Sequence, residues 1–162
     1  MALSVIILAG ARNSGKTKTL DEMARRLQKT SARTYSFKGK VIRIYKSSPQ
    51  EQCTFCHYQK VITIIDGEIR RCVSENCTLL IVPFTMGMNR QGELNADCIT
   101  KPTDHLRSGG LKVHLVYFRR ESVRRLNLLD DLMSRLGAQI IKSTQDYTRQ
   151  AHELLAIARA DP

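Results

Sequence analysis

The chain has 162 residues, 42% of them hydrophobic and 25% charged, which is ordinary for a globular protein with its own core. This composition excludes a fibrous or disordered chain, and we expect a single domain over residues 1–162. The net charge of +11 is unusual, and it predicts a polyanionic partner, nucleic acid before a membrane surface. A basic surface without a specific partner is the alternative.

The sequence carries no pattern of a secreted or membrane-spanning protein. Its apolar start has no basic segment before it, which predicts a core strand rather than a secretory signal. The longest later apolar run, residues 79–84, is too short to cross a bilayer. We therefore expect a cytoplasmic protein with no membrane partner, whose five cysteines are reduced.

Residues 10–17 read G-A-R-N-S-G-K-T, a complete G-x-x-x-x-G-K-[ST] phosphate-binding motif. The apolar, β-branched run 3–9 before it predicts a buried strand. After it, apolar residues recur at i, i+3, i+4 and i+7, as on one face of a helix, at Leu20, Met23, Ala24 and Leu27. A strand and a helix on either side are the context that this motif requires, so a chance match is disfavoured.

The motif predicts binding of ATP with Mg²⁺. The glycines allow successive peptide N–H groups to point into one concavity at the positive end of a helix. Lys16 is expected to reach the β- and γ-phosphates, and the Thr17 hydroxyl to hold the metal ion. The expected nucleotide-binding residues are Gly10, Asn13, Ser14, Gly15, Lys16, Thr17 and Lys18.

The rest of the chain alternates between strand-like and helix-like segments. We expect strands over residues 34–37, 41–45, 78–84, 111–118 and 138–142. We expect helices over residues 69–76, 122–136 and 144–160. The long segment 85–110 should carry a helix of its own or move with function. Such alternation predicts an α/β protein with a three-layer P-loop NTPase fold, a mostly parallel sheet with helices on both faces.

Residues 61–65 permit two interpretations. The run V-I-T-I-I is rich in β-branched residues and is followed by Asp66 and Gly67, which favours a buried strand ending in a Walker B acid. In that case Asp66 would be a catalytic and metal-binding residue near the magnesium ion. As a helix, the same residues also place their apolar side chains on one face. We prefer the strand.

The order of segments resembles a small ParA/MinD-type ATPase. The resemblance rests on the loop 10–17, on residues 41–50 with their Pro-Gln end, on 64–67, on 76–83, and on 113–118 with the helix through Gly137 and the pair 140–141. It implies a nucleotide-switched ATPase that dimerises around ATP and associates with DNA or a protein partner. The chain departs from the family at Ala11, where a signature lysine is usual, and at residues 45–48, which lack acids. These departures argue against fast hydrolysis but not against nucleotide binding.

Four arginines follow the expected strand 111–118, at Arg119, Arg120, Arg124 and Arg125. The resemblance favours a DNA-backbone site for them. A phosphate-clamping lid of a small-molecule or nucleotide kinase and a solvated basic face are the alternatives. A nucleotide-binding module without turnover is a further possibility.

The cysteines permit one metal-site hypothesis. Cys53 and Cys56, followed by Cys72 and Cys77, approach a four-thiolate zinc spacing. Cys72 falls on an apolar face and Cys77 borders a core strand, so buried thiols are the preferred interpretation.

Overall fold

The computed structural model describes residues 3–12, 14–48, 58–86, 93–120 and 127–161. Its centre is a seven-stranded sheet with the order β2-β3-β4-β5-β1-β6-β7. The strands are β1 (Ser4–Ala11), β2 (Gln28–Lys29), β3 (Thr34–Phe37), β4 (Lys40–Ile44), β5 (Leu79–Met86), β6 (Lys112–Arg119) and β7 (Gln139–Lys142). The helices are α1 (Lys16–Arg25), α2 (Tyr58–Ser74), α3 (Asp97–Ser108), α4 (Asn127–Arg135) and α5 (Tyr147–Ala160).

The sheet is mostly parallel, as predicted. Strand β1 lies between β5 and β6 and is parallel to both, and β4 and β7 extend the parallel set on either side. Strands β2 and β3 add an antiparallel edge beyond β4. Every residue of β1 is buried, because a central parallel strand is covered on both faces. The loop that follows β1 therefore starts from a fully buried strand inside the sheet.

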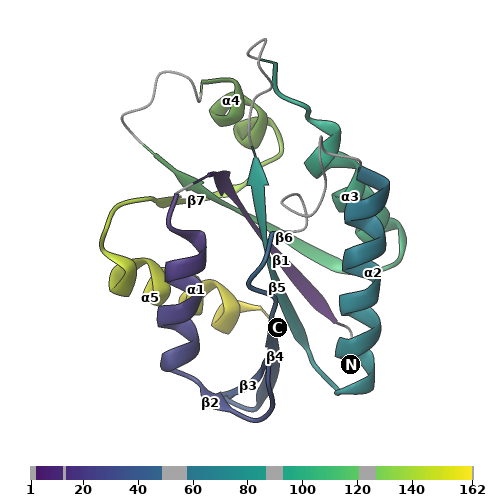
Figure 1. The fold of residues 1–162 in the computed structure, drawn as a ribbon, viewed down its shortest axis with the longest axis vertical. Helices are drawn as coiled ribbons and strands as arrows, with labels where there is room; N and C mark the ends of the chain where they lie inside the picture. Colours follow the sequence, from purple (N-terminus) through teal and green to yellow (C-terminus); the bar gives the residue numbers. More distant parts are fainter. Residues whose placement is uncertain (1–2, 13, 49–57, 87–92, 121–126, 162) are drawn as a thin grey trace.

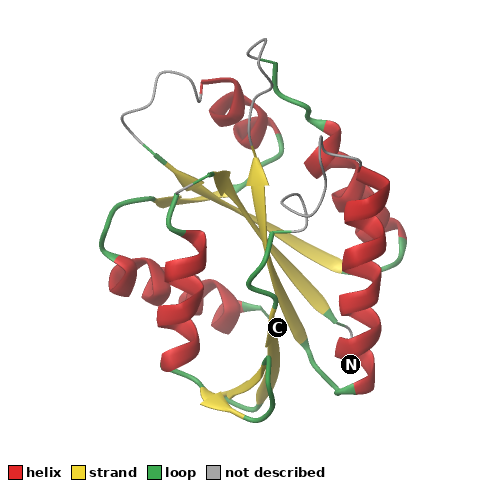
Figure 2. Cartoon of the chain, viewed as in Figure 1, coloured by secondary structure: helices red, strands yellow, loops and turns green. Residues whose placement is uncertain are grey.

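Helices cover both faces, as Figures 1 and 2 show. Helices α1 and α5 lie side by side on one face, and α2 and α3 on the other. The two cores divide along β1: Ile6 and Leu8 pack toward α1 and α5, whereas Val5, Ile7 and Ala9 pack toward α2, α3 and α4. This alternation follows from the two-residue period of a strand, and it completes the three-layer α/β fold expected from the sequence.

The strand expected over residues 61–65 is wrong, because this segment forms the first half of α2. The buried residues of α2 are Val61, Ile65, Glu68 and Cys72, which recur at helical spacing, while Thr63 is exposed. In a buried parallel strand, the side chains of all five residues 61–65 would be buried on one face of the sheet or the other. Here only Val61 and Ile65 are fully buried, which is the pattern of a helix with one face on the core. The separate helix expected over 69–76 is instead the second half of α2, and the other expected elements are present. The segment 85–110 carries its own helix, α3, and part of the helix expected over 122–136 lies outside the described residues.

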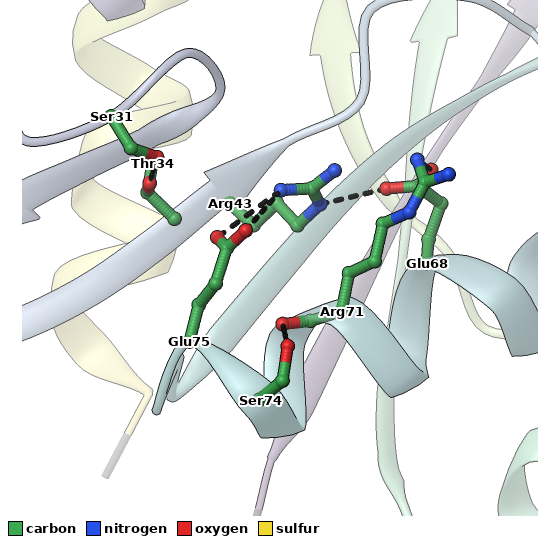
Figure 3. A network of polar contacts seen from close by, with 7 residues as sticks. All are labelled: Ser31, Thr34, Arg43, Glu68, Arg71, Ser74 and Glu75. Atoms are coloured by element: carbon green, nitrogen blue, oxygen red, sulfur yellow. Dashed lines mark hydrogen bonds and ion pairs between the residues drawn. The ribbon is translucent and has the colours of Figure 1, made fainter.

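Buried charges hold α2 against the sheet, as Figure 3 shows. Arg43 of β4 is 4% exposed, and its Nε lies 2.7 Å from Oε2 of Glu68, which is equally buried. Its Nη1 also lies 3.2 Å from Oε2 of Glu75, just beyond α2. Burial opposes the charge on Arg43, but the hydrogen bond and attraction of Glu68 outweigh it and raise the pKa of the guanidinium. Arg71 adds an exposed contact to the same Glu68.

Candidate functional site

The glycine loop joins β1 directly to α1, as the motif requires. Gly15 precedes the helix with φ of 85°, a left-handed conformation that favours glycine. Gly10 lies next to the Ser14 hydroxyl, because a Cβ at Gly10 would come within 2.6 Å of that oxygen. No described side chain caps the start of α1, so its first peptide N–H groups face the loop. Asn13 lies outside the described residues.

Lys16 lies inside the loop. Its side chain is buried, and its Nζ donates hydrogen bonds to the carbonyl oxygens of Gly10 at 3.1 Å and Ala11 at 2.8 Å, and to Oγ of Ser14 at 3.0 Å. These oxygens position the ammonium group at the start of α1, next to the positive end of the helix dipole. Two sources of positive charge therefore converge on the same concavity.

A cavity of about 260 Å³ opens above the loop. It is lined by Arg12, Ser14, Gly15, Lys16, Thr17, Lys18, Lys46, Ser48, Pro83, Thr85 and Tyr147. Four of these residues are cationic, and none of the described lining residues is an aspartate or glutamate. Hydroxyl groups line the cavity instead, from Ser48, beyond β4, and from Thr85, near the end of β5. Ser48 Oγ accepts a hydrogen bond from the Thr85 amide at 2.8 Å. The cavity is suited to an anionic group.

The C-terminal segment closes one side of the loop. The Ser143 hydroxyl donates to the Ser14 carbonyl oxygen. Gln150 of α5 is fully buried; its Nε2 donates to Thr19 Oγ1 at 2.8 Å and its Oε1 accepts from the Thr144 amide at 2.6 Å. Gln150 therefore links the first helix to the β7–α5 connection. This bridge could not be predicted from the sequence, since a glutamine within a helix gives no signal of its partners.

Tyr147 forms the outer wall of the same side. Its ring lies so close to Gly15 that a Cβ there would come within 2.9 Å of the ring atom Cε1. The Nζ of Lys18 lies 5.4 Å from the ring centroid, within the range of a cation–π interaction. An aromatic ring therefore borders the mouth of the cationic cavity.

The architecture is similar to solved structures. A de novo designed protein, described as a PLOOP2X3_50 fold protein, matches with a TM-score of 0.54 and 10% identity, over 99% of this chain and 97% of that chain. The crystal structure of APE1195 matches with a TM-score of 0.57 and 13% identity, over 99% of this chain and 97% of that chain. The chain has the P-loop NTPase fold. The chain matches no protein-family model and no curated protein.

Within this P-loop fold, Asp66 lies away from the place that a Walker B acid would occupy. It belongs to α2, and its two carboxylate oxygens lie 2.9 Å and 3.1 Å from Nε2 of His105 in α3. It does not line the cavity that contains Lys16. Because its expected role depended on the strand at residues 61–65, we withdraw Asp66 as a catalytic and metal-binding residue.

The arginine group is described in part. Arg119 is exposed at the end of β6, and its Nε lies 3.7 Å from Oδ2 of Asp130 in α4. Asp130 also accepts a hydrogen bond from the Tyr117 hydroxyl at 2.6 Å. Arg120 follows directly, whereas Arg124 and Arg125 lie outside the described residues. Neither described arginine lines the cavity of the loop.

The described cysteines give no support to a metal site. Cys72 and Cys77 are free and buried, and burial raises the pKa of both thiols. The described residues contain no cluster of three or more potential metal ligands. Cys98 is disulfide-bonded, so the expectation of reduced cysteines is wrong for this residue.

In the part of the chain that the structure describes, every helix is too short or too polar to span a bilayer.

Proposed function

We propose that this chain binds a nucleoside triphosphate, ATP with Mg²⁺, in the cavity above the loop. The observation that carries the proposal is the Lys16 ammonium, held inside a complete glycine loop by three oxygens at the uncapped start of α1. A phosphate chain is the ligand that such a combination recognises. Residues Gly10, Asn13, Ser14, Gly15, Lys16, Thr17 and Lys18 would bind it.

Magnesium would enter with the nucleotide. Thr17 lines the cavity and would supply a hydroxyl ligand, and the phosphate oxygens and water would supply the others. No acid among the described lining residues is available to complete the metal shell or to activate water. This feature supports a nucleotide switch with slow turnover rather than a fast hydrolase.

The finer proposal is a switch similar to the ParA/MinD ATPases, which would dimerise around ATP and respond to DNA or a protein partner. Its support is the order of segments, the net charge of +11 and the arginines that follow β6. In this proposal Arg119, Arg120, Arg124 and Arg125 would contact the DNA backbone. Arg119 already faces Asp130, so its charge is partly compensated in the free protein.

A kinase is the second candidate, because Arg119 and Arg120 stand at the carboxyl end of β6, the strand beside β1. There they could clamp a transferred phosphoryl group. A kinase would consume ATP only with an acceptor present, whereas the switch would respond to DNA or to a partner protein. Steady-state ATP turnover with and without each addition separates the two.

The test of nucleotide binding compares Lys16→Ala with Lys60→Ala, a matched loss of one lysine at an exposed position of α2. Lys16→Ala removes a charge-assisted phosphate contact worth roughly 1.5–3 kcal/mol, so ATP affinity should fall roughly ten- to hundredfold. Lys60→Ala should bind as the wild type does. Titration with a fluorescent ATP analogue measures both, and circular dichroism checks the fold. Equal affinity of the two folded variants would exclude this function.

A further inference from the structure

The positive charge of this protein is concentrated in one stretch. Residues 23–48 contain no aspartate or glutamate, and they carry eight cations: Arg25, Arg26, Lys29, Arg33, Lys38, Lys40, Arg43 and Lys46. The stretch forms the end of α1, the antiparallel edge β2–β3 and strand β4. By its own residues the stretch carries eight positive charges and no negative ones, and it lies on the other side of β1 from the arginines that follow β6.

Several of these cations already have acidic partners contributed by other segments. Arg43 is buried against Glu68, and Lys40 Nζ lies 3.9 Å from Oδ2 of Asp161. Arg25 and Arg26, at the end of α1, pair with Glu22. Lys46 contacts Asp21 at 2.8 Å. Within the described residues, Lys29, Arg33 and Lys38 take part in no ion pair, and all three are exposed. Their charge is available to a partner.

One of these three cations, Lys29, lines a groove that reaches the cavity of the phosphate loop. The groove has a volume of about 360 Å³ and is lined by Asp21, Ala24, Arg25, Leu27, Lys29, Tyr35 and Lys46. Lys46 also lines the loop cavity, so the two hollows share a wall. Cationic side chains therefore follow one another from Lys16 past Lys46 to Lys29, although Lys46 is paired with Asp21.

Arg33 lies at the same end of β4. Its carbonyl oxygen accepts a hydrogen bond from the Ile44 amide at 3.0 Å, two residues before Lys46. Its guanidinium lies 5.5 Å from the centroid of the Tyr45 ring. This contact holds the charged group beside Tyr45, the residue before Lys46 of the groove wall.

We propose that the unpaired Lys29 and Arg33 bind the phosphate backbone of a nucleic acid strand, which runs along this groove toward the nucleotide cavity. A backbone carries a negative charge at each nucleotide, which matches a row of cations along a groove. A membrane surface fits less well, because stable binding there takes a second signal besides charge, such as apolar side chains that insert. Among the described residues, the large apolar side chains that are exposed are Val73, Leu128 and Ile140, none of them in this stretch.

The experiment measures binding of a fluorescein-labelled 20-nucleotide single strand, and of its duplex, by anisotropy over a salt series. The test variant is Lys29→Ala/Arg33→Ala, and the control is Arg135→Ala/Arg159→Ala, which removes two exposed cations elsewhere. If both test residues contact phosphates, the log–log salt slope should flatten by about 1.4 for the single strand or 1.8 for the duplex. At 0.1 M salt the affinity should then fall roughly 25-fold or more. The control should keep the wild-type slope.

Different failures identify different errors. An equal loss in both double variants would show that only net charge matters and overturn the proposal. So would a loss confined to Arg119→Ala/Arg120→Ala, or binding to phosphatidylserine vesicles without binding to either nucleic acid. Since Arg33 contacts Tyr45, the single variant Lys29→Ala provides a second test; it should flatten the single-strand slope by about 0.7. This proposal can fail or hold independently of nucleotide binding. The Lys16→Ala variant should lose affinity for ATP and keep the wild-type affinity for the labelled nucleic acid.

Discussion

The two faces of the sheet are held by different chemistry. On the face of α1 and α5, the loop that contains Lys16 is tied to the C-terminal segment by neutral hydrogen bonds from Gln150 and Ser143. On the face of α2 and α3, a buried Arg43–Glu68 ion pair fastens a helix to β4 (Figure 3). The cavity lies beside the neutral bridges. Four substitutions test this difference, from the largest expected effect to the smallest.

Arg43→Ala should have the largest effect on stability. It leaves Glu68, which is 4% exposed, with only the contact of the exposed Arg71, and the loss of one partner of a buried ion pair costs roughly 3–5 kcal/mol. Arg71→Ala is the matched control, because Arg71 contacts the same carboxylate from a side chain that is 61% exposed. The control should cost less than about 1 kcal/mol. Urea unfolding measures both free energies, and similar values would show that the buried pair contributes nothing special.

Gly15→Ala should destabilise the protein by roughly 1–3 kcal/mol, because a residue with a side chain is strained at φ of 85°. The new Cβ would also press on Tyr147, whose ring atom Cε1 would lie 2.9 Å away. Gly67→Ala is the control on the other face. That position lies inside α2, and its Cβ would meet Arg70 at an ordinary 3.8 Å. The control should stabilise by roughly 0.5–1 kcal/mol, so thermal unfolding should report opposite signs. A loss in both variants would contradict this view of the loop.

Gln150→Ala should cost roughly 1–3 kcal/mol, since it leaves the fully buried Thr19 hydroxyl without the donor of its bridge. Glu153→Ala, one turn along on the exposed side of α5, should change the free energy of unfolding by less than about 0.5 kcal/mol. Hydrogen exchange should also quicken at the amides around Thr19 in the Gln150 variant. Unchanged exchange there would mean that the bridge does not hold the loop.

Asp66→Asn should have the smallest effect. The Asp66–His105 pair joins two side chains that are 37% and 44% exposed, and exposed pairs contribute less than about 1 kcal/mol. Because Asp66 does not line the cavity, the affinity for ATP in the presence of magnesium should equal that of the wild type. A large, magnesium-dependent loss of affinity would restore the Walker B hypothesis.

Local sequence was sufficient for the loop and for most of the sheet. Each of these elements is encoded by a few neighbouring residues: the motif at 10–17, the β-branched runs of β1 and β5, and the helical periodicity of α1 and α5. The structure has all of them. The run at 61–65 was ambiguous for a physical reason. Its β-branched composition suits a strand, but the core buries only one face of the segment. The residues that form this core lie far along the chain.

What only the tertiary structure decided is the set of long-range partners. The pairing of Asp66 with His105, the Gln150 bridge to Thr19, and the groove that joins Lys46 to Lys29 all bring together residues from separate segments. Sequence determined which residues carry charge and where the phosphate loop begins. It could not determine their neighbours, because those depend on the order in which strands join the sheet and on which face each helix covers.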